Sequence, residues 1–332
     1  MNYYLKRTIR IPLTVLAVVS LTFGMIRLLP GGPFTQLRVR LLRQGLPAEQ
    51  VNARIAELQG IRPDEPLYIQ YVDYVVSVAQ LDLGQSISLN KPVIEVVAGA
   101  LPWTVFIVVT STVLMFAAGI LIGAVQAYQE GSVFDSLTSG TSIFLMSVPY
   151  YIFAVLGLFY LGYEHQLFPT QFGVGRNVET GFTAAYFISV LQHGALPILS
   201  FTIGGIGSTA LSMRSNSIQI LGEEYVEVAR LRGLTDQRIA TRYVARNAIL
   251  PMYTGLLTLI GFRLGGTVIL EQIFSYPGLG NYLISAVNAN DYPLMMGCFL
   301  VITVTLVLAV YIADLTYGLI DPRISTGDSD AY

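Results

Sequence analysis

Residues 96–129 read VVAGALPWTVFIVVTSTVLMFAAGILIGAVQAYQ, a run without a single charged side chain. A helix needs about 20 mostly apolar residues to cross the hydrocarbon core of a bilayer. Lipid offers no partner to a backbone N–H or C=O group, and the run lacks the alternation of a barrel strand. The stretch therefore predicts a transmembrane α-helix.

Five further apolar runs follow the same pattern. They cover residues 11–26, 136–163, 180–213, 250–270 and 292–313, and the fifth of the chain's six runs is interrupted only by Arg263. Together the runs predict an all-α polytopic membrane protein with six transmembrane helices. The runs at 96–129 and 180–213 exceed one span, so Pro102 and Pro197 are expected near helix starts at the outer interface.

The composition supports membrane embedding and excludes several other classes. Of 332 residues, 53% are hydrophobic and 12% charged, with mean hydropathy +0.60. A net charge of −2 gives no basic field for nucleic acid. The single cysteine, Cys298, excludes an internal disulfide framework. Lysine occurs only at positions 6 and 91, a depletion that, with the acidic pI, hints at a high-salt organism.

Basic residues predict the orientation. Lys6, Arg7 and Arg10 precede the first run, which ends in LPGGP (29–33) instead of a small-x-small cleavage site, so we expect a retained span. The loop 214–246 carries six arginines, whereas the alternate short loops are nearly free of basic residues. The positive-inside rule then places this loop and both termini on the cytoplasmic side of the membrane.

Three segments organise the chain. Residues 1–98 hold the first span and an external segment with amphipathic helices predicted at 48–58 and 66–80. Residues 99–323 form the core domain with five spans and the cytoplasmic loop 214–247. Residues 324–332 are expected to be a disordered tail.

The most informative loop is 223–251, EEYVEVARLRGLTDQRIATRYVARNAILP. It predicts two short helices separated at 233–236, with Gly233 at φ > 0 and Thr235 or Asp236 as the next cap. Val226, Ala229 and Arg230 share one helix face. A basic amphipathic helix pair suits docking into a groove of another protein, but a basic cytoplasmic loop without a partner fits the same residues.

Motifs in and around this loop resemble a known family. Glu227, Ala229 and Gly233 match the Glu-Ala-Ala-x3-Gly coupling loop of binding-protein-dependent ABC importer permeases, with Val228 replacing the middle alanine. Further motifs resemble the oligopeptide/dipeptide/nickel branch of this family. They are DLGQS at 82–86, SVP at 147–149, ALP at 195–197, RNAILP at 246–251, EQIFSYPGLG at 271–280 and DYP at 291–293. The LPGGP at 29–33 resembles the B-type permease of each pair.

The resemblance implies a type I ABC importer architecture in the cell (plasma) membrane of a prokaryote. A second, homologous permease, two P-loop ATPase subunits carrying ATP and Mg, and an external solute-binding protein would complete it in the lipid bilayer. The coupling residues it implies are Glu227, Ala229, Arg230, Arg232, Gly233 and Leu234. The implied substrate is a peptide, with nickel chelates and oligosaccharides as alternatives within the family.

The chain itself has no P-loop, because Leu5 precedes Lys6 and Asn90 precedes Lys91, and that motif requires Gly-Lys. We therefore expect a non-enzymatic transport subunit without catalytic residues or a cofactor of its own. His165 and His193 lack ligand spacing, so no metal site is expected.

Four residues are candidates for the transport pathway: Arg263, Ser147, Pro149 and Glu271. A charge near the middle of a span costs on the order of 3 kcal/mol, so Arg263 is expected to face a cavity or a partner helix. It would then bind a polar group of the solute, or form an ion pair with another helix or the second permease. Glu271 is expected to help shape the external gate, and Ser147 to satisfy a backbone group freed by Pro149.

The rival functions need features that the sequence lacks. An ion-coupled secondary transporter would show paired intramembrane carboxylates and inverted repeats. An intramembrane enzyme would need a catalytic constellation in its spans, and neither pattern is visible. A structural membrane protein without a transport role stays open on composition alone.

Overall fold

The computed structural model describes residues 3–27, 35–59, 65–175 and 177–320. The LPGGP motif at 29–33 and the expected tail at 324–332 lie outside the described residues. The regular structure of the described residues is helical, apart from one isolated bridge between Gln85 and Pro92. In chain order the first helices are α1 (Tyr3–Arg27), α2 (Thr35–Arg43), α3 (Ala48–Gln59), α4 (Leu67–Ala79), α5 (Val93–Tyr128), α6 (Val133–Ser147), α7 (Tyr150–Gly157) and the π-helix η1 (Leu158–Glu164). They are followed by α8 (Ala184–Leu221), α9 (Glu224–Leu231), α10 (Asp236–Arg238), the π-helix η2 (Ile239–Ala245), α11 (Arg246–Gly266), α12 (Val268–Ile273), α13 (Leu279–Ala289) and α14 (Tyr292–Ile320).

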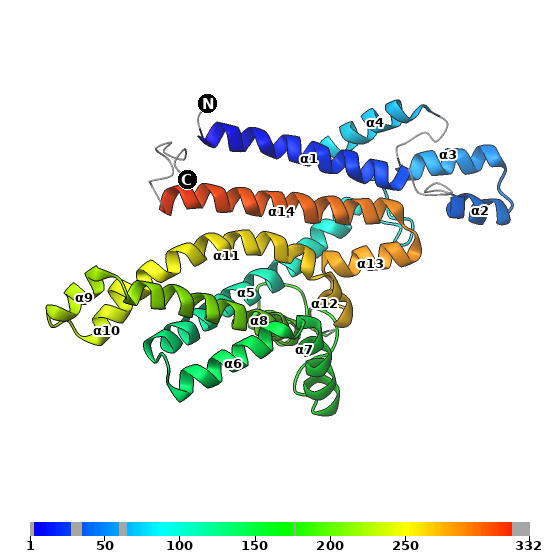
Figure 1. Cartoon of the computed structure of the whole chain (residues 1–332). Helices are drawn as coiled ribbons and strands as arrows, with labels where there is room; N and C mark the ends of the chain where they lie inside the picture. Colours follow the sequence, from blue (N-terminus) through cyan, green and yellow to red (C-terminus); the bar gives the residue numbers. More distant parts are fainter. Residues whose placement is uncertain (1–2, 28–34, 60–64, 176, 321–332) are drawn as a thin grey trace. The chain divides into compact units, whose positions relative to one another are not determined.

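The chain divides into two compact units, and the first contains both ends of the sequence. It comprises Met1–Thr104, Leu264–Gln272 and Pro277–Tyr332. Helices α1 and α14 run alongside each other (Figure 1), and the hydroxyls of Thr8 and Tyr311 hydrogen-bond across them at 3.0 Å. One core joins α1, α4 and α14, and a second joins the start of α5 to α13 and α14.

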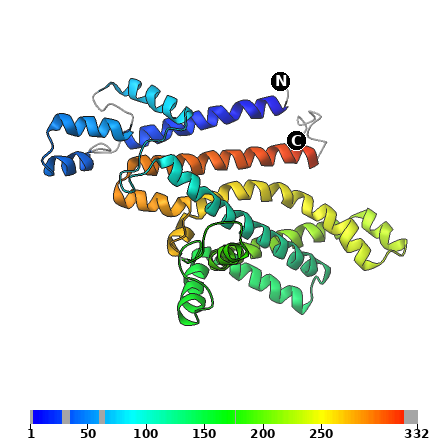
Figure 2. The ribbon, with the colours of Figure 1, turned by 180° about the vertical axis from the view of Figure 1, so that it is seen from behind.

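The second unit comprises Val105–Arg263 and Ile273–Tyr276 and is centred on α8. Helices α6 and α7 pack on α8, as both views of the ribbon show (Figures 1 and 2). Helix α5 approaches α8 so closely that a Cβ on Gly123 would lie 2.2 Å from the Ala210 carbonyl oxygen. At the start of α6, Asp135 accepts two hydrogen bonds from the Arg214 guanidinium, each at 2.7 Å. Glycine therefore sets the α5–α8 contact, and a buried carboxylate ties α6 to the same helix.

The predicted spans coincide with helices. Three described helices are long and apolar enough to cross a membrane, at Val93–Tyr128, Ala184–Leu221 and Tyr292–Ile312. The third predicted run is a helix pair, Val133–Ser147 and Tyr150–Glu164, bent by 91° at the break. The first and fifth runs fall on α1 and α11. The architecture is thus all-α with several membrane spans, as expected.

The expected positions of the two prolines were wrong. Pro102 and Pro197 lie inside α5 and α8, not near the starts of these helices. The start of α8 is set instead by Thr183, whose hydroxyl oxygen accepts the Tyr186 N–H. Proline is tolerated within membrane helices because neighbouring groups satisfy the freed carbonyl.

In the segment expected outside the membrane, both predicted helices are present as α3 and α4. Helix α2, rich in arginine, was not predicted.

Candidate coupling and pathway sites

The loop between α8 and α11 folds around a small core of its own. Four side chains fill it, Val226 and Ala229 from α9 and Ile239 and Val244 from η2. This core confirms the predicted pair of short helices, although the second consists of α10 running into the π-helix η2. We call α9, α10, η2 and the turn between them the coupling pair; it can be followed at one end of the second unit in Figures 1 and 2.

The turn of the coupling pair depends on Gly233. Its φ of +72° lies in the left-handed region, as predicted. The Gly233 N–H donates to the Arg230 carbonyl at 2.9 Å, and the Leu234 N–H donates to the Ala229 carbonyl at 3.3 Å. These two bonds form a Schellman motif, with Leu234 packed against the core. Thr235 occupies the next N-cap position without a side-chain capping bond.

The six predicted coupling residues divide into two groups. Glu227, Arg230, Arg232 and Gly233 are exposed, and so is their neighbour Leu231, whose exposure is 82%. Ala229, in contrast, is buried in the core of the coupling pair, and Leu234 packs against that core half-buried. The Ala229 side chain therefore packs inside its own chain, and the contact of the exposed residues with an ATPase subunit remains a prediction.

Hydrogen bonds of Asn247 anchor the coupling pair and carried no signal in the sequence. The Asn247 amide donates to the Tyr225 hydroxyl at 3.2 Å and to the Tyr243 carbonyl at 2.8 Å. Tyr128 at the end of α5 and Val244 of η2 line one small cavity. The pair is thus attached to the first turn of α11 and adjoins the end of α5.

Arg263 lies within the second unit and faces α8. Its guanidinium carbon is 4.2 Å from the centre of the Phe201 ring, and Nη2 donates to the Phe201 carbonyl at 3.4 Å. The Nη1 atom is buried and has no hydrogen-bond partner among the described residues. Gly205 leaves room for this arrangement, since a Cβ there would be 2.5 Å from Nη2. Arg263 therefore packs against α8 of its own unit, and its place in the transport pathway remains a prediction.

A groove of about 410 Å³ lies between α5, α8 and α11 in the same unit. Its lining residues are Met115, Phe116, Ser208, Thr209, Ser212, Asn216, Pro251, Met252, Gly255, Leu256 and Leu259. Helix α8 contributes the hydroxyl and amide groups, and α11 contributes apolar side chains. Its volume is within the range of small-molecule sites.

Ser147 and Pro149 form the break between α6 and α7. The Ser147 hydroxyl donates to the Ile143 carbonyl at 2.8 Å, one turn back in α6. Pro149 is the N-cap of α7, where its missing N–H costs little. The N–H that Pro149 lacks would bond the Leu145 carbonyl in a continuous helix, so the expectation that Ser147 satisfies the group freed by Pro149 was wrong.

Glu271 lies inside the first unit and is fully buried. Its carboxylate accepts the Thr104 hydroxyl at 2.8 Å and the N–H groups of Gly280 and Asn281 at 2.7 and 3.2 Å. A buried carboxylate with several donors joins three chain segments. Its contacts describe a structural hub, and a direct role in a gate remains a prediction.

Two sequence motifs about 200 residues apart meet in the first unit. Asp291 Oδ2 accepts the Ser86 hydroxyl at 2.6 Å, the Ser88 hydroxyl at 2.7 Å and the Ser88 N–H at 2.8 Å. Its Oδ1 accepts the Leu294 N–H in the first turn of α14. One carboxylate therefore caps a helix and fastens the turn before α5.

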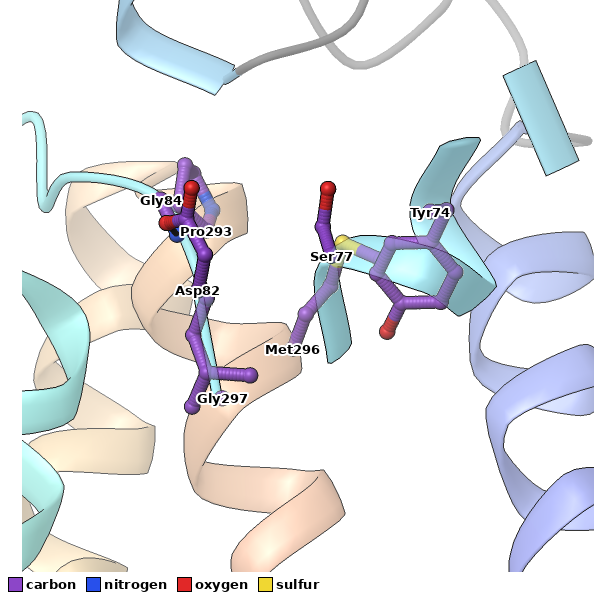
Figure 3. Close-up of a pocket in the computed structure, with 8 residues that line it drawn as sticks. Tyr74, Ser77, Asp82, Gly84, Pro293, Met296 and Gly297 are labelled. Carbon is purple, nitrogen blue, oxygen red and sulfur yellow. Dashed lines mark hydrogen bonds between the residues drawn. The ribbon is translucent and has the colours of Figure 1, made fainter. Parts of the chain in front are cut away.

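A small cavity of about 30 Å³ lies nearby, between α4, the segment after it and the start of α14. Its lining, drawn in Figure 3, includes Tyr74 and Ser77 of α4 and Pro293, Met296 and Gly297 of α14. Burial raises the pKa of Tyr74 to about 12, so its hydroxyl stays protonated at physiological pH. The cavity has room for one or two water molecules and is too small for a transported solute.

Comparison with known proteins identifies the family. Residues 119–326 match the family described as "Binding-protein-dependent transport system inner membrane component". The chain is 30% identical over 340 residues to the dipeptide transport system permease protein DppB of Escherichia coli K12, with 98% of each chain covered. It is 29% identical over 326 residues to DppB of Bacillus subtilis, with 97% of each covered. It is also 28% identical over 323 residues to the oligopeptide transport system permease protein AppB of Bacillus subtilis, with 97% of this chain and 98% of AppB covered.

The solved structure described as "Crystal structure of an amino acid ABC transporter with histidines" is similar to this chain at 17% identity and a TM-score of 0.46. The alignment covers 69% of this chain and 94% of the chain in that structure. The sequence matches over nearly the whole chain are the stronger finding. The chain belongs to the family of binding-protein-dependent inner membrane components, the multi-pass permease subunits of ATP-binding-cassette importers.

Proposed function

We propose that this chain forms half of a translocation pathway for peptides. ATP hydrolysis takes place on separate subunits, and the coupling pair transmits their conformational change to this chain. Relatives covering nearly the whole chain are named dipeptide, oligopeptide and di/tripeptide permeases, which supports a peptide substrate. A second permease would supply the other half, and an external binding protein would deliver the solute. Two P-loop ATPase subunits would hold ATP and Mg.

The observation that carries the proposal is the exposed face of α9. Leu231 is 82% exposed, and Val228 and Tyr225 are also exposed, although the coupling pair has a complete core without them. Arg230 and Arg232 flank this apolar face, and each adds a positively charged, planar guanidinium group. An apolar centre with a charged rim is typical of a protein docking surface. The arginines also favour the cytoplasmic side, where an ATPase subunit would bind.

The test replaces Leu231 with aspartate. The side chain contributes nothing to the core of the coupling pair, so the fold should persist while the docking face gains a charge. We expect the tagged chain to retain its partner permease but to lose most of its bound ATPase subunit. The measurement is affinity purification from native membranes in mild detergent, followed by quantitative mass spectrometry.

Leu167→Asp is the matched control. Leu167 is 65% exposed and follows η1, on a segment expected to face the opposite side of the membrane. Equal ATPase binding by both variants would contradict the proposed coupling surface. A wild-type chain that purifies without any P-loop ATPase would contradict the importer function as a whole.

A further inference from the structure

Arg263 has more hydrogen-bond donors than its surroundings use. One guanidinium nitrogen makes a long bond to the Phe201 carbonyl, and Nη1 is buried without a partner. No carboxylate of the described residues forms an ion pair with it. A buried donor without a partner loses the bond that water would provide. The site therefore has unfilled capacity for an acceptor.

The guanidinium lies behind Met115, a residue that lines the groove of the second unit, and is not itself part of the lining. The Met115 sulfur and Arg263 Nη2 both lie within 2.5 Å of the Cβ position at Gly205. Leu259, one helical turn earlier on α11, lines the groove as well. Ser208, Ser212 and Asn216 of α8 add polar groups to the same lining. Only the flexible Met115 side chain is thus required to move for a solute in the groove to approach the guanidinium.

Arg263 contacts an aromatic ring and a backbone carbonyl, both uncharged, in place of a counterion. The Phe201 ring and carbonyl stabilise the charge in the absence of a counterion. A permanent ion pair would make that support unnecessary. The planar fork of an arginine matches a carboxylate with two parallel hydrogen bonds.

We propose that Arg263 binds the C-terminal carboxylate of the transported peptide while the peptide occupies the groove. This inference rests on the proposed function, because it names the group of the solute that this subunit recognises. The hydroxyl and amide groups of α8 then face the peptide backbone. Because Arg263 Nη1 lacks an acceptor, the site should bind peptides with a free C-terminal carboxylate more tightly than peptides whose C-terminus is blocked.

The first test measures binding to the purified transporter complex without binding protein. Trialanine and its C-terminal amide are titrated, and the thermal stabilisation of the complex is recorded. We expect half-maximal stabilisation at a concentration about tenfold lower for the acid than for the amide. Arg263→Met should abolish this preference. Arg263→Lys, which keeps the charge without the fork, should retain part of it.

Phe262→Met is the control for a general disturbance of α11, because Phe262 is 67% exposed and lies outside the groove lining. It should keep the wild-type preference. Equal stabilisation by acid and amide, or no stabilisation by either, would overturn the inference. Loss of the second permease from Arg263→Met but not from Phe262→Met would also overturn it, in favour of an ion pair between subunits.

ATP-dependent uptake of trialanine into proteoliposomes with the binding protein separates this inference from the proposed function. Wild-type uptake together with equal responses to acid and amide refutes only the role of Arg263. Absence of ATP-dependent uptake for every peptide tested refutes the peptide-importer function itself.

Discussion

Substitution of Gly233 by valine tests whether the coupling pair depends on its left-handed turn. A Cβ at this position meets nothing within 4 Å, so crowding adds no cost. The cost is conformational, because φ is +72° and an L-residue loses roughly 1–2 kcal/mol in this region. A branched side chain is disfavoured further. About 2 kcal/mol corresponds to a roughly 30-fold shift in an equilibrium.

The expected result is a ten- to thirtyfold weaker association of the ATPase subunit, with the membrane spans intact. ATPase binding to the purified permease pair can be measured by titration, and peptide-stimulated ATP hydrolysis in proteoliposomes gives a second readout. Gly233→Asn is the matched control, because asparagine enters the left-handed region readily, and it should remain within a few-fold of wild type. If valine and asparagine weaken the association equally, the side chain and not the backbone conformation is responsible, and the reasoning fails.

Three further substitutions test the packing of the two units. Gly123→Ala should lower the melting temperature in detergent, because its Cβ would lie 2.2 Å from the Ala210 carbonyl oxygen; Gly24→Ala, with open space, should not. Asp135→Asn should lower it by several degrees, since Arg214 loses its buried counterion, and an unchanged melting curve would refute the role of this pair. Asp291→Ala should speed proteolytic cleavage within residues 85–92, and equal cleavage rates would show that the three serine bonds do not hold this turn.

The sequence predicted the helices of the spans and of the coupling pair because both depend on local pattern. Charge-free runs locate membrane helices, and Gly233 between two amphipathic segments locates the turn. The third predicted span differs in one respect. Its composition is that of one long run, but the Ser147–Pro149 break bends it by 91°. Hydropathy averages over a window and cannot locate such a break.

Long-range contacts were beyond local pattern. The motifs at 82–86 and 291–293 were recognisable, yet nothing in either indicates that Ser86 and Asp291 meet. Arg263 was singled out by its charge, whereas its contact with Phe201 depends on the register of α8 against α11. Pro102 and Pro197 were misplaced because run length alone does not show where a helix begins.

The near-contact of α5 and α8 has a mechanical consequence. Gly119 and Gly123 both face α8, where an added Cβ would lie 2.6 Å from the Thr209 Cβ and 2.2 Å from the Ala210 carbonyl oxygen. Sliding α5 along α8 by one turn would bring Met115 or Ala127 to the place of one of these glycines, so the close contact opposes sliding. With 38 residues, α8 is about 57 Å long at a rise of 1.5 Å per residue. A rod of that length tilts by roughly 5° when one end moves about 5 Å. Because the coupling pair follows directly on the end of α8, a small displacement there becomes a rotation along the whole rod.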